Sequence, residues 1–117
     1  MLAAPITPSD LSAVGGFGGN GVLPATGGNE GYGVVEKVGS GVSDLREGDF
    51  VVPALPGAGT WATHTVLRGD CLCKVPETSQ VEVAAVSAVN PSLAHCLLQM
   101  EELEAGDVVL QNNGGSG

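Results

Sequence analysis

The chain has 117 residues, of which 43% are hydrophobic and 15% charged, a composition typical of a globular domain rather than a disordered segment. Its 13 acidic and 4 basic residues give a formal net charge of −9, so we expect no nucleic-acid partner. No stretch approaches the roughly 18 apolar residues of a membrane-spanning helix, so we expect no membrane partner. Residues 1–10 show neither a secretory signal nor a transit-peptide pattern.

The first 28 residues predict an extended start, a short helix and a glycine-rich loop. Pro5 and Pro8 favour an extended backbone, and Ser9 is expected to cap a short helix that begins near Asp10. Glycines are dense across residues 15–28, which predicts a loop that bends sharply or passes close to another group.

Short strands are expected between the glycine-rich loop and residue 75. Apolar and polar positions alternate, or short apolar runs occur, in segments that turn residues separate. These predicted strands are residues 31–38, 50–53, 59–67 and 72–75. Turn signals about every ten residues favour a small β-barrel or sandwich.

The last third of the chain changes character from strands to helices. Helical spacing predicts one helix over 80–88 and a second over 93–103, with Asn90 and Pro91 between them. A buried strand is expected at 108–111, followed by a glycine-rich turn. A strand followed by such a turn is how a dinucleotide-binding fold begins, but a flexible glycine-rich C-terminus fits the same residues.

Three cysteines, Cys71, Cys73 and Cys96, do not have the spacing of a metal site. We therefore expect buried, reduced thiols, which suit an intracellular compartment, and no bound metal.

Three motifs, in order, resemble the medium-chain dehydrogenase/reductase superfamily. Residues 4–10 resemble its N-P-x-D opening, 27–39 its G-x-E-G-x-G-x-V-x-x-V-G signature, and 103–109 the lead into its cofactor strand. The resemblance implies a mainly β fold with some α-helix, in which a GroES-like barrel precedes a Rossmann domain. We expect residues 1–88 to form the barrel without its first strand. Residues 89–117 would then hold the connecting helix and the first strand and turn of an incomplete Rossmann domain.

Within this superfamily, several short motifs are similar to those of the mitochondrial enoyl thioester reductases. They lie at residues 27–31, 59–61, 89–91 and 111–112. The resemblance implies NADPH-dependent reduction of trans-2-enoyl thioesters of CoA or acyl-carrier protein, a part in mitochondrial fatty-acid synthesis, a mitochondrial location and a homodimer. Zinc-dependent branches have Gly-His-Glu where this chain has Gly-Asn-Glu at 28–30, so no catalytic zinc is implied.

The resemblance also indicates the catalytic positions, and it shows departures there. A tyrosine in the glycine-rich loop is the usual hydroxyl donor of this branch, and its position here is Phe17, which has no hydroxyl. Thr7 stands where the family prefers asparagine and keeps a hydroxyl that would serve instead. Leu93 stands where a threonine is usual. The implied cofactor-binding residues are Asn90, Gln111, Asn112, Gly114, Gly115 and Ser116.

Several of these residues have a structural reading beside the functional one. Phe17 fits a loop residue that covers the cofactor site. Glu30 fits either a group that orients the active site or a carboxylate bonded to nearby amides. Trp61 fits barrel core or pocket wall, and His64 and His95 fit structural roles.

Three hypotheses about function follow. The first is an active enoyl thioester reductase of which this chain alone is inactive, because the chain lacks most of the cofactor site. The second is a non-catalytic barrel module or decayed copy. The third is an NADPH quinone reductase of the same superfamily.

Overall fold

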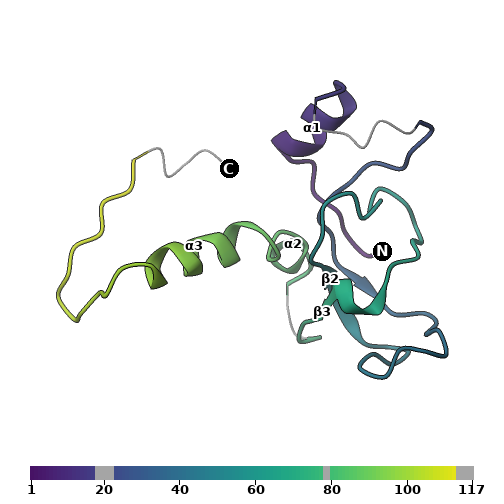
Figure 1. The fold of residues 1–117 in the computed structure, drawn as a ribbon. Helices are drawn as coiled ribbons and strands as arrows, with labels where there is room; N and C mark the ends of the chain where they lie inside the picture. Colours follow the sequence, from purple (N-terminus) through teal and green to yellow (C-terminus); the bar gives the residue numbers. More distant parts are fainter. Residues whose placement is uncertain (18–22, 78–79, 113–117) are drawn as a thin grey trace.

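The computed structural model describes residues 1–17, 23–77 and 80–112. Figure 1 shows the strands and their long loops gathered at one side of the molecule, with helix α3 extending away from them. The fold is thus a sheet-centred body that continues into a helical arm. None of the helices within the described ranges has the length and apolar character required to span a bilayer.

The sheet has three short antiparallel strands in the order β1-β2-β3. They are β1 (Gly33–Val34), β2 (Phe50–Pro53) and β3 (Leu72–Lys74). Val51 of the central strand lies opposite Gly33 on one side and Lys74 on the other. A bridge between Ala3 and Tyr32, in which each amide hydrogen-bonds across, adds the N-terminus to this sheet.

Two of the four predicted strands match the structure and two do not. The strands expected at 50–53 and 72–75 are confirmed, the second one residue shorter. Of the strand expected at 31–38, only Gly33 and Val34 form a strand, with Tyr32 in the bridge to Ala3, and the strand expected at 59–67 is wrong. The amides of Thr60 and Trp61 donate to the carbonyls of Gly28 and Gly27 at 3.2 and 3.0 Å, so this segment is tied to a loop rather than to a strand.

Helix α1 (Pro8–Val14) begins at a capping box and not at the predicted cap. Thr7, rather than Ser9, is the N-cap, and its side chain and that of Asp10 bond each other's backbone amides. The prediction of Ser9 was wrong because a capping box needs its partners three residues apart, as Thr7 and Asp10 are.

Two further α-helices follow the sheet, together with a short 3-10 turn, η1 (Gly69–Cys71). Helix α2 (Val81–Ala85) is shorter than the predicted 80–88, and α3 (Asn90–Gln99) begins and ends earlier than the predicted 93–103. Proline is tolerated in the first helical turn, where its missing N–H has no partner to lose, so α3 includes Pro91.

The buried core joins the sheet to α2. Its members are Tyr32, Val52, Ala84 and Ala85, with Phe50 packed beside them. The rings of Tyr32 and Phe50 stack with centroids 5.6 Å apart. Each large side chain buried in this way stabilises the fold by roughly 1.5–3 kcal/mol.

The segment after α3 differs from its prediction. The buried strand expected at 108–111 is neither a strand nor buried, since Val108 and Leu110 are 82% and 92% exposed. A buried parallel strand requires neighbouring strands, and the residues that the structure describes place none beside it. The cysteines were also predicted to be buried, but Cys73 and Cys96 are exposed free thiols and Cys71 is half-buried.

Candidate functional site

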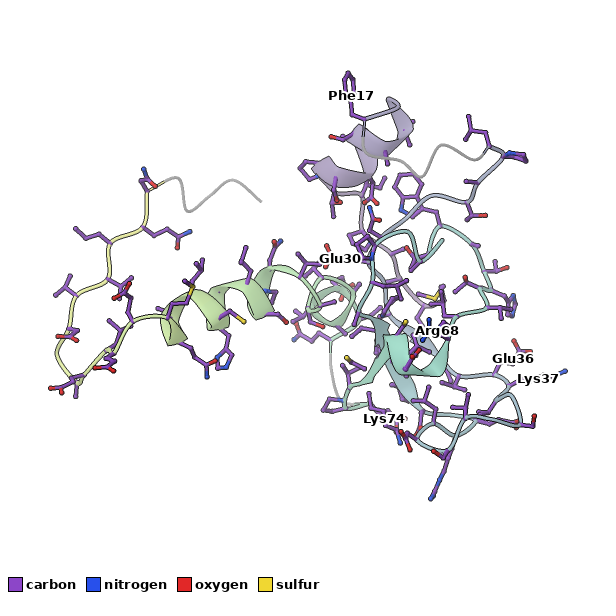
Figure 2. All side chains as sticks on the ribbon, viewed as in Figure 1. Phe17, Glu30, Glu36, Lys37, Arg68 and Lys74 are labelled. Carbon is purple, nitrogen blue, oxygen red and sulfur yellow. The ribbon has the colours of Figure 1, made fainter. Side chains whose placement is uncertain are left out.

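A cavity of about 580 Å³ opens where α1, the segment after the glycine-rich loop and the start of α3 meet. Its apolar lining comes chiefly from Phe17, Leu55, Pro56 and Val89. The remaining lining residues are Ser9, Ser12, Ala13, Asn29, Glu30, Pro53, Ala54 and Ala88. Figure 2 shows Phe17 at the far end of α1 and Glu30 in the interior.

A hydrogen-bond network centred on Asp10 holds one wall of this cavity. One carboxylate oxygen accepts from the amide and the hydroxyl of Thr7 at 2.8 and 2.7 Å. The other accepts from the backbone and side-chain amides of Asn29 at 3.0 and 2.7 Å. The side-chain oxygen of Asn29 in turn accepts from the Gly57 amide at 2.7 Å. The network therefore joins α1, the signature segment and the 53–57 loop.

The pKa of the Asp10 carboxyl is lowered. Burial acts to raise it, but the hydrogen bonds from Thr7 and Asn29 stabilise the charged form and outweigh that effect. Asp10 is thus a buried carboxylate, 2% exposed, whose negative charge its own donors hold in place.

Glu30 lies in the opposite environment. It is 5% exposed, and its Oε2 atom has no hydrogen-bond partner. Burial raises the pKa of this carboxyl, the nearby negative charge of Asp10 raises it further, and the backbone amide of Val89 acts in the other direction without reversing the shift. Glu30 is the one ionisable side chain among the described residues that line the cavity.

Close backbone packing fixes the segment that carries Glu30. Gly28 has a φ of +97°, and a Cβ atom there would lie 2.3 Å from the Thr60 hydroxyl. That hydroxyl donates to the backbone carbonyl of Glu30 at 2.6 Å. Trp61 packs against Gly27 and donates from its indole N–H to the Pro5 carbonyl at 3.0 Å. Trp61 therefore supports the segment from behind and does not line the cavity.

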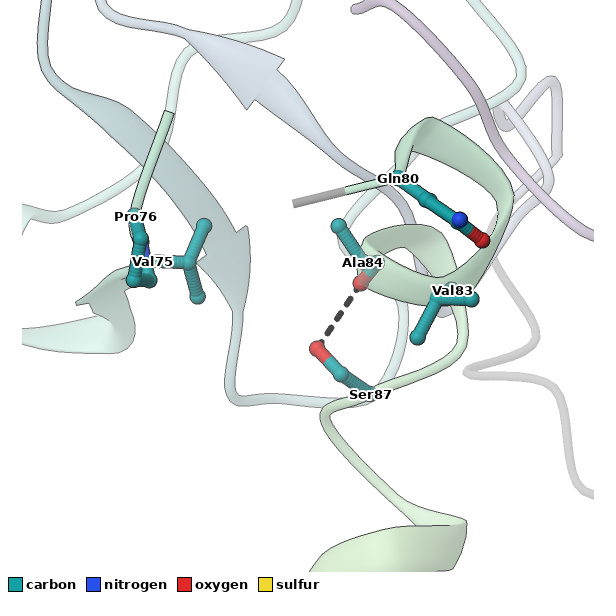
Figure 3. A pocket seen from close by; sticks show the side chains of 6 residues that line it. All are labelled: Val75, Pro76, Gln80, Val83, Ala84 and Ser87. Carbon is teal, nitrogen blue, oxygen red and sulfur yellow. Dashed lines mark hydrogen bonds between the residues drawn. The ribbon is translucent and has the colours of Figure 1, made fainter. Parts of the chain in front are cut away.

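A second hollow, of about 390 Å³, lies between the end of β3 and α2 (Figure 3). Its lining includes Val75, Pro76 and Val83, and it has no ionisable side chain among its described residues. The Ser87 hydroxyl at its edge donates to the Ala84 carbonyl at 2.8 Å and is already engaged. The other polar side chain of its described lining, Gln80, is exposed, so the hollow has no buried polar group to orient a ligand, and the cavity with Glu30 is the better candidate site.

Comparison with protein families bears on the barrel part of the chain, because residues 1–77 match the model of the alcohol dehydrogenase GroES-like domain. The chain belongs to this GroES-like domain family. The predicted superfamily resemblance and the mainly β, GroES-like fold class are confirmed.

The similar proteins are reductases much longer than this chain. The mitochondrial enoyl-[acyl-carrier-protein] reductase of Rattus norvegicus is 48% identical over 119 residues, which cover 100% of this chain and 32% of that protein. The enzymes of the same name from Homo sapiens and Arabidopsis thaliana are 46% and 40% identical, each again with 32% of its length covered. The chain thus spans about a third of the length of the curated relatives that it matches.

Solved structures give the same result for the fold. The Etr1p/NADP/crotonyl-CoA complex superposes with a TM-score of 0.72 at 30% identity, covering 86% of this chain and 33% of that one. The mitochondrial 2-enoyl thioester reductase Etr1p/Etr2p heterodimer from Candida tropicalis gives a TM-score of 0.71 at 31% identity, with the same coverage.

The GroES-like domain brings only some of the predicted site residues together. Phe17 reaches the cavity, although its ring is 80% exposed. Thr7 does not line the cavity, and its hydroxyl is engaged in the capping box. Asn90, Gln111 and Asn112 are exposed and also lie outside the lining. Three predicted cofactor residues lie outside the described residues: Gly114, Gly115 and Ser116.

The described residues do not by themselves fit a dinucleotide. Phosphates bind to cationic side chains or clustered amides, and no Lys or Arg belongs to the described lining of the cavity. Lys37, Arg68 and Lys74 lie away from Phe17 in Figure 2, and the last two pair with Asp70 and Asp49. The described ranges also hold no group of three or more His, Cys, Asp or Glu side chains that could bind a metal.

Sequence reasoning missed the role of Asp10 and Asn29 in building the site. Asp10 was expected only near a helix start, and Asn29 only as part of the signature. The spacing of Thr7 and Asp10, three residues apart, was the available signal for the capping box. Nothing local predicts the bond from Asp10 to Asn29, which spans 19 positions.

Proposed function

We propose that this chain is the GroES-like part of an NADPH-dependent reductase of trans-2-enoyl thioesters, and that it supplies the substrate side of the active site. The supporting observation is the cavity of about 580 Å³, which is mainly apolar and carries one buried carboxyl group at Glu30. Such a cavity suits an acyl chain that ends in one polar, uncharged group. The relatives support the same substrate class, since Etr1p was solved with NADP and crotonyl-CoA.

The residues of this chain would act on the thioester part of the substrate. Phe17, Leu55 and Val89 pack against the acyl chain and exclude water from it. During reduction of an enoyl thioester, negative charge develops on the thioester carbonyl oxygen. A hydrogen-bond donor placed at that oxygen stabilises this charge, and such a donor is typically worth on the order of 10²–10³ in rate.

NADPH would be held mostly by residues outside the described part of the chain. The exposed side chains of α3 and of the segment after it favour a larger protein around this domain, because Leu97, Met100 and Leu110 are 56%, 77% and 92% exposed. We further propose a mitochondrial location, as the names of the relatives state for them, and a dimer formed by parts other than this domain.

The test is an assay of NADPH oxidation with crotonyl-CoA, run on the complete polypeptide that carries this sequence and on residues 1–117 alone. We expect turnover by the complete polypeptide and none by the 117-residue chain, which lacks a described site for the dinucleotide. Turnover by the short chain would contradict the proposal. A complete polypeptide that reduces quinones but not crotonyl-CoA would instead be a quinone reductase.

A non-catalytic module or decayed copy is the second candidate, and Phe17 favours it. A phenyl ring cannot donate the hydrogen bond that a tyrosine would. If the complete polypeptide binds NADPH and crotonyl-CoA but oxidises no NADPH, this second candidate replaces the first.

A further inference from the structure

Two neighbouring carboxyl groups of the GroES-like domain have opposite surroundings. Asp10 accepts four hydrogen bonds, from Thr7 and Asn29. Glu30, the residue after Asn29, is 5% exposed and leaves Oε2 without a partner. A buried charge without donors is strongly unfavourable, and a second negative charge nearby makes it more so. These surroundings favour the charged form of Asp10 and the neutral, protonated form of Glu30.

The position of that proton follows from the donors around Glu30. The backbone amide of Val89 faces the carboxyl group, and an amide N–H suits an oxygen that accepts. Oε2 has no hydrogen-bond partner among the described residues, so a proton on this oxygen would be an unengaged donor. Glu30 lines the cavity and its Oε2 atom is shielded from solvent, so a hydrogen bond formed between this O–H and a ligand would be buried.

We propose that Glu30 is a neutral carboxylic acid that donates a hydrogen bond to a carbonyl oxygen of the ligand in this cavity. The proposal rests on the proposed function and adds a residue to it. The carbonyl belongs to the enoyl thioester or to the nicotinamide carboxamide, which share this chemistry. A neutral acid in an apolar site donates to a developing oxyanion without adding charge of its own.

The same assignment explains how the site functions with phenylalanine at position 17. The ring of Phe17 is 80% exposed at the cavity mouth and offers only packing. Glu30 lies deeper and is fixed by two long-range contacts, through the Thr60 hydroxyl on its carbonyl and through the Asp10–Asn29 bond beside it. A donor held in this way needs no reorganisation when charge develops on its partner.

The pH dependence follows from the groups that face Glu30. These are the Asp10 carboxylate of α1 and the Val89 amide before α3. When the pH rises above its raised pKa, Glu30 loses the proton, and the site then presents a second negative charge in place of a donor. We expect kcat to fall on the alkaline side of the profile as that proton is lost.

The experiment compares Glu30→Gln, Glu30→Leu and the control Glu36→Gln in the complete polypeptide. Glu36 has a side chain 67% exposed and pairs with His64, so its variant should match the wild type. Glutamine keeps a neutral donor, so Glu30→Gln should stay within about 10-fold in kcat and lose the alkaline limb. Glu30→Leu should lose on the order of 10²–10³ in kcat. A rise in KM for crotonyl-CoA alone assigns the thioester, and a rise in KM for NADPH alone assigns the carboxamide.

Two results would overturn the assignment. If Glu30→Leu stays within about 3-fold of the wild type in kcat and in both KM values, Glu30 has no part in the site. If Glu30→Gln has a kcat as low as that of Glu30→Leu, and circular dichroism shows that both variants are folded, then position 30 does not act as a hydrogen-bond donor.

A direct measurement keeps this inference separate from the proposed function. Carbon-13 NMR of the glutamate carboxyls should show Glu30 titrating above its ordinary value of 4.5 and shifting when crotonyl-CoA is added. If the wild type oxidises no NADPH, the proposed function fails. The assignment of Glu30 also fails if its carboxyl titrates at or below the ordinary value of 4.5, or if its signal does not shift with either crotonyl-CoA or NADPH.

Discussion

The sheet-centred region of residues 1–77 and the helical arm of residues 90–112 are stabilised in different ways. In the first region, Tyr32 and Val52 are 1% and 4% exposed, and a hydrogen-bond network joins segments far apart in sequence. In the second, α3 has no buried residue and is held by its own backbone bonds. A ten-residue helix without tertiary contacts is marginal in water. The described contacts therefore make the first region and α2 one packed unit, and they bury no side chain of α3.

The cavity lies at the junction of these two regions, and the comparison shows which one determines its geometry. Asn29 and Glu30 belong to the first region and are fixed by long-range bonds. Only Ala88 and Val89, just before α3, come from the junction. The polar chemistry of the site is thus set by the well-packed region, and the junction before the arm contributes one apolar edge.

Removing the ring at the centre of the first region should have the largest effect. We expect Tyr32→Ala to lower the free energy of unfolding by about 3–5 kcal/mol, because it leaves a cavity beside Phe50 and Val52. Chemical denaturation of the complete polypeptide measures this loss. Val66→Ala, at a side chain 99% exposed, is the control and should change stability by less than about 0.5 kcal/mol. A loss of under about 1 kcal/mol for Tyr32→Ala would mean that this core is not what holds the region together.

The network at Asp10 should have the next largest effect. Asp10→Ala removes the acceptor for Thr7 and Asn29, and we expect a loss of about 2–3 kcal/mol at neutral pH. The exposed Asp44, replaced by alanine, is the control and should change stability by less than about 0.5 kcal/mol.

The acid side of the stability profile tests the same carboxylate. The pKa of Asp10 in the folded state lies below its ordinary value of 3.8, so its contribution is fully present above that value and is lost as the pH falls through the folded pKa. The difference between wild type and Asp10→Ala should therefore shrink in acid. A difference that stays constant down to the lowest pH at which both fold would contradict a charged Asp10.

Short sequence patterns correctly predicted the helices and strands that depend on residues close together in the chain. The short apolar runs at 50–53 and 72–75 became β2 and β3 because turn residues bound them on both sides. The start of α1 was recognised near Asp10, although the cap is Thr7. These patterns depend on residues only a few positions apart, which is why they can be read without the fold.

The elements that depend on a distant partner were mispredicted. Residues 59–67 alternate like a strand, but their first amides bond to Gly27 and Gly28, which the alternation does not reveal. Residues 108–111 read as a buried strand, yet Leu110 is 92% exposed, because burial requires neighbouring strands. A side-chain period describes which face a residue would occupy, and it does not say what lies against that face.

The candidate site was predictable in position but not in chemistry. The signature motif drew attention to residues 27–31, of which Asn29 and Glu30 line the cavity, and the glycine-rich loop drew attention to Phe17, which also lines it. That Glu30 is buried with an unpartnered oxygen depends on Ala88, Val89 and the 53–56 loop closing over it, more than 20 positions away. Burial by segments distant in sequence favours the neutral form of a carboxyl group, so the sequence alone did not determine the role of Glu30.

Substitution of an exposed residue on α3 should have little effect on the stability of the sheet-centred region, in contrast to Tyr32→Ala. Leu97 is 56% exposed and contributes to no described core, so Leu97→Ser should lower the unfolding free energy of residues 1–117 by less than about 0.5 kcal/mol. In the complete polypeptide, the loss should exceed 1 kcal/mol if other parts of the protein bury this face. The two measurements together show whether the arm is packed elsewhere, and equal losses in both settings would mean that it is not.

The smallest effect is expected at Phe17, the position where the family tyrosine is missing. Because Glu30 is proposed to supply the hydrogen bond and the Phe17 ring is 80% exposed at the cavity mouth, Phe17→Tyr should change kcat of the complete polypeptide by less than about 3-fold. Phe17→Leu is the matched control, since it keeps an apolar side chain and removes the ring. A gain on the order of 10²–10³ for Phe17→Tyr alone would show instead that the site lacks a donor and that the chain belongs to a decayed copy. The double variant Phe17→Tyr/Glu30→Leu then separates the two donors. If the tyrosine restores the activity lost with Glu30, both groups act at the same oxygen. If it restores nothing, Glu30 is the donor that the cavity needs.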